Sequence, residues 1–172
     1  MRRAVPVIVI VVLLAGACSK NETPTAPTPP IPAAESPTTV AFVSDPSALA
    51  GRGESQTYTV QNATFQVGTD SRMVSVAVLP LGTTEAVWRF VIRPPGNQVL
   101  APGTFQIGGA SGHGFEFTGR GDRCAGTGTL TIEDIQNAGG LVERLRVKFA
   151  LSCGGAVNGR IELHWVPGVG YR

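Results

Sequence analysis

The sequence predicts a single all-β domain, an antiparallel β-sandwich or barrel-like fold with one disulfide, preceded by a signal peptide and a disordered linker. First, short apolar stretches recur from Val40 onward, separated by Gly, Pro and Asn, and no segment of useful length has helical periodicity. Second, apolar and polar residues alternate in most of these stretches, as in half-buried strands. Third, the stretch holds two cysteines, Cys124 and Cys153. Roughly 130 residues suffice for one core of this kind.

Residues 1–17 have the layout of a signal peptide. Arg2 and Arg3 supply a positive start, residues 4–14 are apolar, and small residues lead to Cys18. A membrane-spanning helix is the alternative interpretation. A helix of roughly 14 residues rises only about 21 Å, however, which is short of the ~30 Å hydrocarbon core. We therefore expect cleavage rather than a membrane span.

The run Leu14-Ala15-Gly16-Ala17-Cys18 resembles the lipobox of bacterial lipoprotein precursors, in which a small residue precedes an invariant cysteine. The resemblance implies cleavage between Ala17 and Cys18, lipid on Cys18 and acylation, as with palmitate, of the new amino terminus. Several acyl chains at ~0.8 kcal/mol per buried CH₂ would anchor the chain in a membrane. Ser19 stands where an acidic residue marks inner-membrane retention, which points to the outer membrane of a two-membrane envelope. The alternative is ordinary secretion.

Cysteine number and charge agree with this processing. Lipid on Cys18 leaves Cys124 and Cys153 to form one disulfide in an oxidising compartment. Removal of Arg2 and Arg3 leaves 12 of the 14 basic side chains against 12 acidic ones. A neutral chain with no Lys/Arg cluster lacks the electrostatic pattern of a nucleic-acid-binding protein, so we expect no nucleic-acid partner.

Residues 18–39 form the expected linker, which is rich in Thr and Pro between Thr23 and Pro32. Such a segment cannot bury a core and favours extended polyproline conformers, which reach up to about 60 Å at ~3.1 Å per residue. We expect a passive tether. A proline-rich ligand for another domain is the alternative, although the repeats lack a PxxP-plus-Arg signature. The β domain is then 40–167 and the C-terminal tail 168–172.

Alternation predicts the strands in chain order. Trp88, Phe90 and Ile92 share one face of their strand, as core residues do, and most other aromatic residues alternate with apolar neighbours. Of the aromatic residues, only Tyr171 is expected to be free, so an aromatic platform for sugars has no support. The strands are 40–43, 56–60, 63–67, 73–79, 86–92, 104–107, 113–118, 126–135, 142–152 and 160–166.

A hairpin is predicted around residues 137–140, in one specific register. It places the two cysteines opposite each other and its apolar pairs on one side, with an opposite-charge pair on the other. A one-residue slip would invert every side chain, and the poor match of Asp134 with Glu143 predicts a bulge near the turn. The expected pairs are Cys124–Cys153, Gly128–Phe149, Leu130–Val147 and Ile132–Leu145 inside, with Thr129–Lys148, Thr131–Arg146 and Glu133–Arg144 outside.

A second resemblance covers roughly residues 50 to 166. Its motifs are Gln56-Thr57-Tyr58, Trp88, Ala101-Pro102-Gly103-Thr104, Gly119-Arg120-Gly121 with Cys124, Gly128-Thr129-Leu130, Phe149 with Cys153, and Gly159-Arg160-Ile161. In this order they resemble an uncharacterised β-sandwich module of secreted bacterial proteins. Gly154 departs from the acidic residue that often follows the second cysteine. The resemblance implies a fold and carries no activity.

Candidate site motifs are sparse. Arg120-Gly121-Asp122 spells a tripeptide that integrins recognise, but a three-residue match is a weak signal for adhesion. Ser111 lies in a glycine-rich loop without the G-x-S-x-G pattern of a hydrolase, and we expect a flexible connection there. His113 and His164 are expected at the surface, without the further ligands that zinc needs. The sequence therefore predicts no catalytic residue, metal or cofactor.

Together these features predict a lipid-anchored protein of the bacterial cell envelope, a non-enzymatic structural, adhesive or binding module. Its partners are the membrane, through Cys18, and a protein or glycan whose identity the sequence leaves open, as it does the oligomeric state. The alternative is an enzyme accessory or hydrolase-associated carbohydrate-binding domain. The first is preferred because reaction-capable residues in a recognisable arrangement are missing from the sequence.

Replacing Cys18 tests the anchor. Cys18→Ala removes the thiol that carries the lipid, so the variant should accumulate as an uncleaved or soluble species. Membrane fractionation and the mass of the N-terminal peptide measure this. Ser19→Ala is the matched control and should remain anchored. Unchanged anchoring of Cys18→Ala would contradict the lipobox.

Overall fold

Strands make up the regular structure of this computed structural model, which describes residues 37–172 apart from 71 and 110–111. The all-β prediction is confirmed, since twelve strands and no helix occur in that part of the chain. The predicted signal peptide, Cys18 and nearly all of the linker lie outside the described residues. All ten predicted strands are present, and each differs from its predicted bounds at one end or at both.

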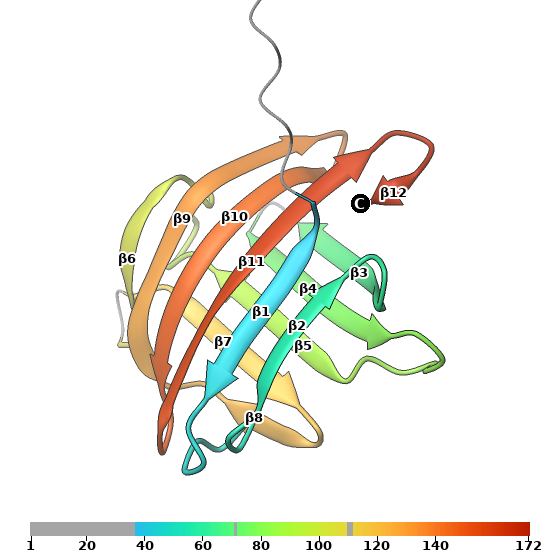
Figure 1. The fold of residues 1–172 in the computed structure, drawn as a ribbon. Coiled ribbons are helices and arrows are strands. Elements are labelled where there is room, and N and C mark those ends of the chain that lie inside the picture. The colour runs from blue at the N-terminus through green and yellow to red at the C-terminus, as the bar shows by residue number, and fades with distance from the viewer. Residues whose placement is uncertain (1–36, 71, 110–111) are drawn as a thin grey trace, which may run out of the picture. The chain divides into compact units, whose positions relative to one another are not determined.

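The strands form two antiparallel sheets, which lie face to face in Figure 1. The seven-stranded sheet has the order β2 (Ser55–Thr59), β1 (Thr39–Ser44), β11 (Ala156–Val166), β10 (Leu141–Ser152), β9 (Thr127–Ala138) and β6 (Gly103–Ile107), and β12 (Gly170–Tyr171) pairs with β11. The five-stranded sheet has the order β3 (Ala63–Asp70), β4 (Met73–Pro80), β5 (Trp88–Arg93), β7 (Gly114–Gly119) and β8 (Asp122–Cys124). This arrangement is a β-sandwich.

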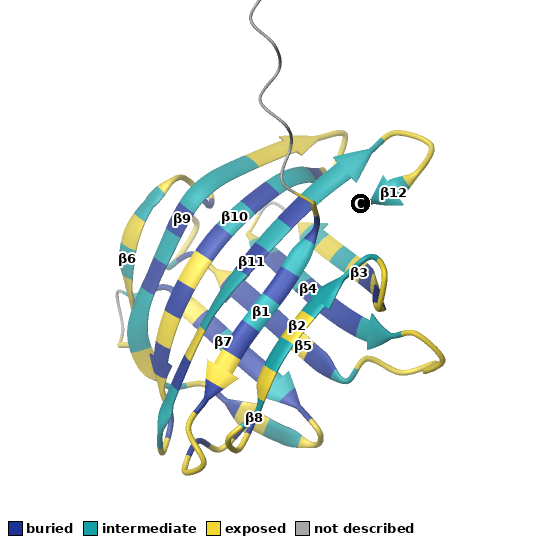
Figure 2. Ribbon diagram, viewed as in Figure 1, coloured by how far each residue is buried: buried dark blue, intermediate teal, exposed yellow. Residues whose placement is uncertain are grey.

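The core lies between the two sheets, where alternate residues of the longer strands are buried (Figure 2). Phe42 of β1 contacts Trp88 of β5 and Phe117 of β7, with ring centroids 4.8 and 4.9 Å apart. Phe117 also stacks on Phe90 at 5.0 Å. Trp88 donates its indole N–H to the hydroxyl oxygen of Tyr58 at 2.8 Å, so the buried ring leaves no polar group unpaired.

The β9–β10 hairpin forms with the predicted faces but not the predicted register. Leu130 lies opposite Phe149, and Ile132 lies opposite Val147, a shift of two residues. A two-residue shift keeps every side chain on its face, so alternation could not detect it. The turn decides the register, because Gly139 and Gly140 have φ of 58° and 81°, as a two-residue hairpin turn requires. The predicted irregularity is confirmed by register shifts at 142/144 and 146/147.

The disulfide between Cys124 and Cys153 is confirmed, with Cα atoms 5.6 Å apart, but its place in the fold differs from the prediction. Cys124 ends β8 and pairs with Phe117 in the five-stranded sheet, whereas Cys153 follows β10 of the other sheet. The predicted cross-strand position is therefore wrong. Its cause is the tight turn at residues 120–121, which folds β8 back onto β7 before β9 begins. The disulfide joins the two sheets.

The expected C-terminal tail is part of the sheet. Tyr171 in β12 lies opposite Trp165, with ring centroids 5.0 Å apart, and donates its hydroxyl to the carbonyl of Val142 at 2.8 Å. Burial raises the pKa of Tyr171 to about 12. At the same end of the domain, the backbone N–H of Thr38 donates to the carbonyl of Arg172 at 2.7 Å. Tyr171 is thus half-buried rather than free.

Removing the disulfide tests its role in stability. The double variant Cys124→Ala, Cys153→Ala should lose about 3–4 kcal/mol of unfolding free energy, because the closed loop no longer restricts the unfolded chain. Guanidinium unfolding followed by tryptophan fluorescence measures the change. Ser152→Ala, an exposed neighbour of Cys153, is the control and should leave the midpoint unchanged. An unchanged midpoint in the double variant would contradict the prediction.

Candidate functional site

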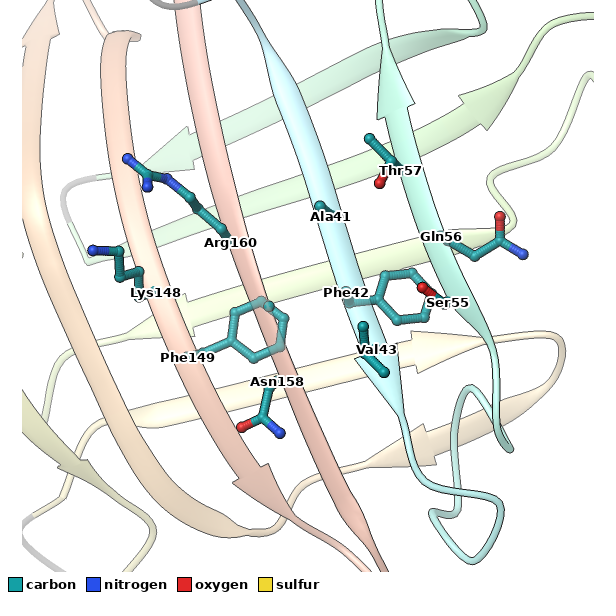
Figure 3. Close-up of a pocket in the computed structure, with 11 residues that line it drawn as sticks. Ala41, Phe42, Val43, Ser55, Gln56, Thr57, Lys148, Phe149, Asn158 and Arg160 are labelled. Atoms are coloured by element: carbon teal, nitrogen blue, oxygen red, sulfur yellow. The ribbon is translucent and has the colours of Figure 1, made fainter.

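A hollow of about 470 Å³ lies on the seven-stranded sheet and is the candidate binding site (Figure 3). Strands β1, β2, β10 and β11 contribute its walls. The lining residues are Ala41, Phe42, Val43, Ser55, Gln56, Thr57, Lys148, Phe149, Asn158, Gly159 and Arg160. The hollow is therefore assembled from segments that are more than a hundred residues apart in the chain.

The strand register explains why the surface is hollowed there. Ala41 lies between Thr57 on β2 and Arg160 on β11, so a methyl group stands where its neighbours carry longer side chains. Beside it, Gly159 pairs with Phe149 of β10. A Cβ at Gly159 would lie 2.4 Å from Cζ of Phe149, and 2.6 Å from the carbonyl oxygen of Ala41. The absence of a side chain at Gly159 thus lets the Phe149 ring pack closely beneath the strands that form the base of the hollow.

Two cationic side chains, Lys148 and Arg160, border one side of the hollow, and each forms an ion pair with a carboxylate. Lys148 Nζ lies 2.5 Å from one carboxylate oxygen of Glu133, and Arg160 Nη2 lies 3.3 Å from the other. Arg160 also forms an ion pair with Glu162. The hydrogen bond from Lys148 holds the pKa of Glu133 below its usual value, and the nearby charges of Lys148, Arg160 and Arg146 act in the same direction against partial burial. The positive charges of Lys148 and Arg160 are therefore balanced by neighbouring carboxylates of the sheet.

This network replaces the predicted Glu133–Arg144 pair, which is wrong. Arg144 instead contacts Asp134, with Nη1 and Oδ2 3.5 Å apart. The two-residue difference in register explains the exchange, because Lys148 lies opposite Thr131 and thus beside Glu133. The charged rows of the sheet remain on the outer face, as alternation predicted.

The other side of the hollow offers polar groups without protein partners. In the described residues, the side chains of Ser55, Thr57 and Asn158 are exposed and make no hydrogen bond to the protein. Val43 lies among them with 57% of its surface exposed. Hydroxyl and amide groups thus surround a small apolar surface, a combination that orients a small ligand by hydrogen bonds and contacts its apolar face.

The Arg120-Gly121-Asp122 motif forms the turn between β7 and β8, with φ of 53° at Arg120 and 89° at Gly121. Both charged groups contact a neighbouring loop. Arg120 Nε lies 3.0 Å from Glu54, and Asp122 lies 3.0 Å from Arg52. A partner that reads this motif would have to compete with these two ion pairs.

The two histidines lie apart from the hollow. His113 is only 5% exposed and its ring lies 4.0 Å from that of Phe105, so the prediction of a surface residue is wrong. Its bridge to Ile107 draws it inward, and burial lowers its pKa. His164 is half-buried at the end of β11. Ser111 lies outside the described residues. Within those residues, no three His, Cys, Asp or Glu side chains are grouped to hold a metal ion.

Sequence reasoning missed the hollow because its residues look ordinary one strand at a time. The only local signal is the small pair Ala41 and Gly159 between polar neighbours. That signal acquires meaning only when β1 is known to pair with β11.

The sequence matches no family model, and neither a curated protein nor a solved structure shows significant similarity to it. In the described part of the chain, no helix is long and apolar enough to cross a membrane.

A charge-neutral variant tests the network beside the hollow. Because the pKa of Glu133 is lowered in the folded protein, its ion pairs stabilise the fold above the usual glutamate pKa and lose this effect as pH falls through the lowered value. Glu133→Gln should therefore be less stable than the wild type at pH ~7, by no more than about 1 kcal/mol, and equal to it at pH ~2.

Urea unfolding at the two pH values measures this difference. Glu85→Gln is the control, since Glu85 is exposed and has no ion pair among the described residues. A difference between wild type and Glu133→Gln that persists undiminished at the lower pH would contradict the assignment.

Proposed function

We propose that this protein is a non-enzymatic binding module that lipid on Cys18 holds at the bacterial envelope, on the outer membrane where there are two. The order of charged, apolar and small residues before Cys18 supports the anchor. The disulfide between Cys124 and Cys153 supports residence in an oxidising compartment. The sandwich is then the part that the anchor displays.

The hollow over β1 and β11 is the observation that carries the binding role. Its polar groups stand on paired strands rather than on loops, so their positions are fixed before a ligand arrives. Ser55, Thr57 and Asn158 can both donate and accept hydrogen bonds, and Val43 supplies an apolar contact. The ligand that fits this chemistry is neutral, with hydrogen-bonding edges and an apolar face, as in a sugar ring of an envelope glycan.

The charges around the hollow favour binding over catalysis. The carboxylates that contact its lining residues, Glu133, Glu162 and Glu54, each form an ion pair with a cation. A general acid or base would need a proton-accepting group directed at a bound substrate. The same surface on an enzyme-associated protein would act as a carbohydrate-binding accessory, so the mode of recognition is common to both interpretations.

Filling the hollow tests the binding role. Ala41→Phe places a ring where a methyl group forms the floor, and should weaken binding of a responsive oligosaccharide at least tenfold, an order-of-magnitude expectation for loss of a central contact. A panel of neutral and amino-sugar oligosaccharides is screened against the full chain by calorimetry and by amide chemical shifts of β1 and β11. Ala138→Phe, at an exposed strand position away from the hollow, is the matched control.

Two results would contradict the proposal. One is a set of amide chemical-shift changes that cluster away from residues 41, 57 and 158. The other is tight binding that survives Ala41→Phe. A wild-type chain that binds none of the oligosaccharides would exclude a glycan as the ligand.

A further inference from the structure

Strand β3 presents an open edge of the five-stranded sheet (Figure 1). It pairs with β4 over all eight residues, from Ala63 opposite Pro80 to Asp70 opposite Met73, without a bulge. On its other side, no backbone hydrogen bond to β3 occurs within the described part of the chain. A row of backbone donors and acceptors therefore faces outward.

This edge lacks the usual protection against pairing. Natural edge strands are short, or carry Lys, Pro or bulges that prevent another strand from adding. The other edge strands are shorter, since β2 and β6 have five residues and β8 has three. In contrast, β3 has no Lys, Arg or Pro, and its one charged residue is Asp70 at the end.

A groove with both polar and apolar walls follows the same edge. It has a volume of about 570 Å³ and is bordered by Phe65 and Val67 of β3 and by Trp165 and Tyr171 of the other sheet. Two of the large apolar side chains that are exposed in the described residues border it as well, Val169 at 67% and Leu141 at 44%. Apolar surface beside a free strand edge gives an added strand both backbone hydrogen bonds and side-chain burial.

We propose that β3 pairs antiparallel with β3 of a second copy of this chain, about a two-fold axis at Gln66. The two five-stranded sheets then form one continuous sheet. In this register Gln66 lies opposite its own copy, and Phe65 lies opposite Val67 in both directions. The remaining pairs are Thr64 with Gly68 and Ala63 with Thr69.

The side chains of β3 select both the partner and the register. Phe65 and Val67 point to the inner face, so the axis at Gln66 joins an aromatic to a β-branched residue twice, a favourable cross-strand pair. A shift of two residues would place Phe65 opposite Thr69 in one direction and opposite its own copy in the other, so both Phe65–Val67 pairs form only with the axis at Gln66. A shift of one would place inner residues opposite outer ones. Asp70, the one charged residue of β3, does not lie opposite its own copy in this register, so no like charges face each other. The strand is thus complementary to itself, as a two-fold interface requires.

A charge exchange at the axis tests the pairing. Gln66 is exposed, so Gln66→Lys and Gln66→Glu leave the core intact, but each places two like charges opposite each other. The full chain in detergent is examined by sedimentation equilibrium. The wild type should dimerise, each variant alone should dimerise at least tenfold more weakly, and the 1:1 mixture should recover the affinity as a heterodimer. Gln106→Lys on edge strand β6 is the control and should behave as the wild type.

A second measurement does not depend on charge. Gln66→Cys should form an intermolecular disulfide on diamide oxidation, and Gln106→Cys should not. The proposal is overturned if the wild type stays monomeric, if Gln66→Lys dimerises like the wild type, or if Gln66→Cys fails to cross-link. Failure of the mixed Lys and Glu variants to pair would overturn the register at Gln66.

Discussion

Phe42 inserts its ring between the sheets against Trp88 and Phe117, and the described structure depends on this contact. Each sheet buries its inner face mainly against the other sheet. Truncating such a core aromatic residue to alanine typically costs about 3–5 kcal/mol, a large part of the stability of a small domain. The inner anchors Phe42 and Ile161 also hold β1 and β11 at the spacing that forms the hollow on the opposite face. Core and candidate site are two faces of the same strands.

Alternation was enough to predict the fold class and ten of the twelve strands, because burial on one face imposes a period of two residues. It missed β8 and β12, which have three and two residues, too few to show a period. It also began β11 late, since Asn158 and Gly159 are typical of a turn. Gly159 is in a strand because the Phe149 ring fills the space that its side chain would occupy.

The site was less predictable than the fold, for a different physical reason. A hollow on a sheet depends on which strands are neighbours, and β1 pairs with β11 across more than a hundred residues of chain. The ion-pair partners of Glu133 also depend on the register of β9 and β10. Alternation cannot determine this register, because a shift by an even number of residues leaves every side chain on the same face. Polar residues at 55, 57 and 158 show no local pattern that distinguishes them from ordinary surface residues.

The central position of β1 also determines when the domain can fold. β1 is the first strand and lies between β2 and β11, while Thr38 bonds to Arg172 at the end of the chain. During synthesis the seven-stranded sheet cannot be completed before β11 has been made, because β1 lies between β2 and β11. Non-local pairing of this kind folds slowly. Until β11 has been synthesised, β1 lacks one of its two partner strands, and the core between the sheets stays incomplete.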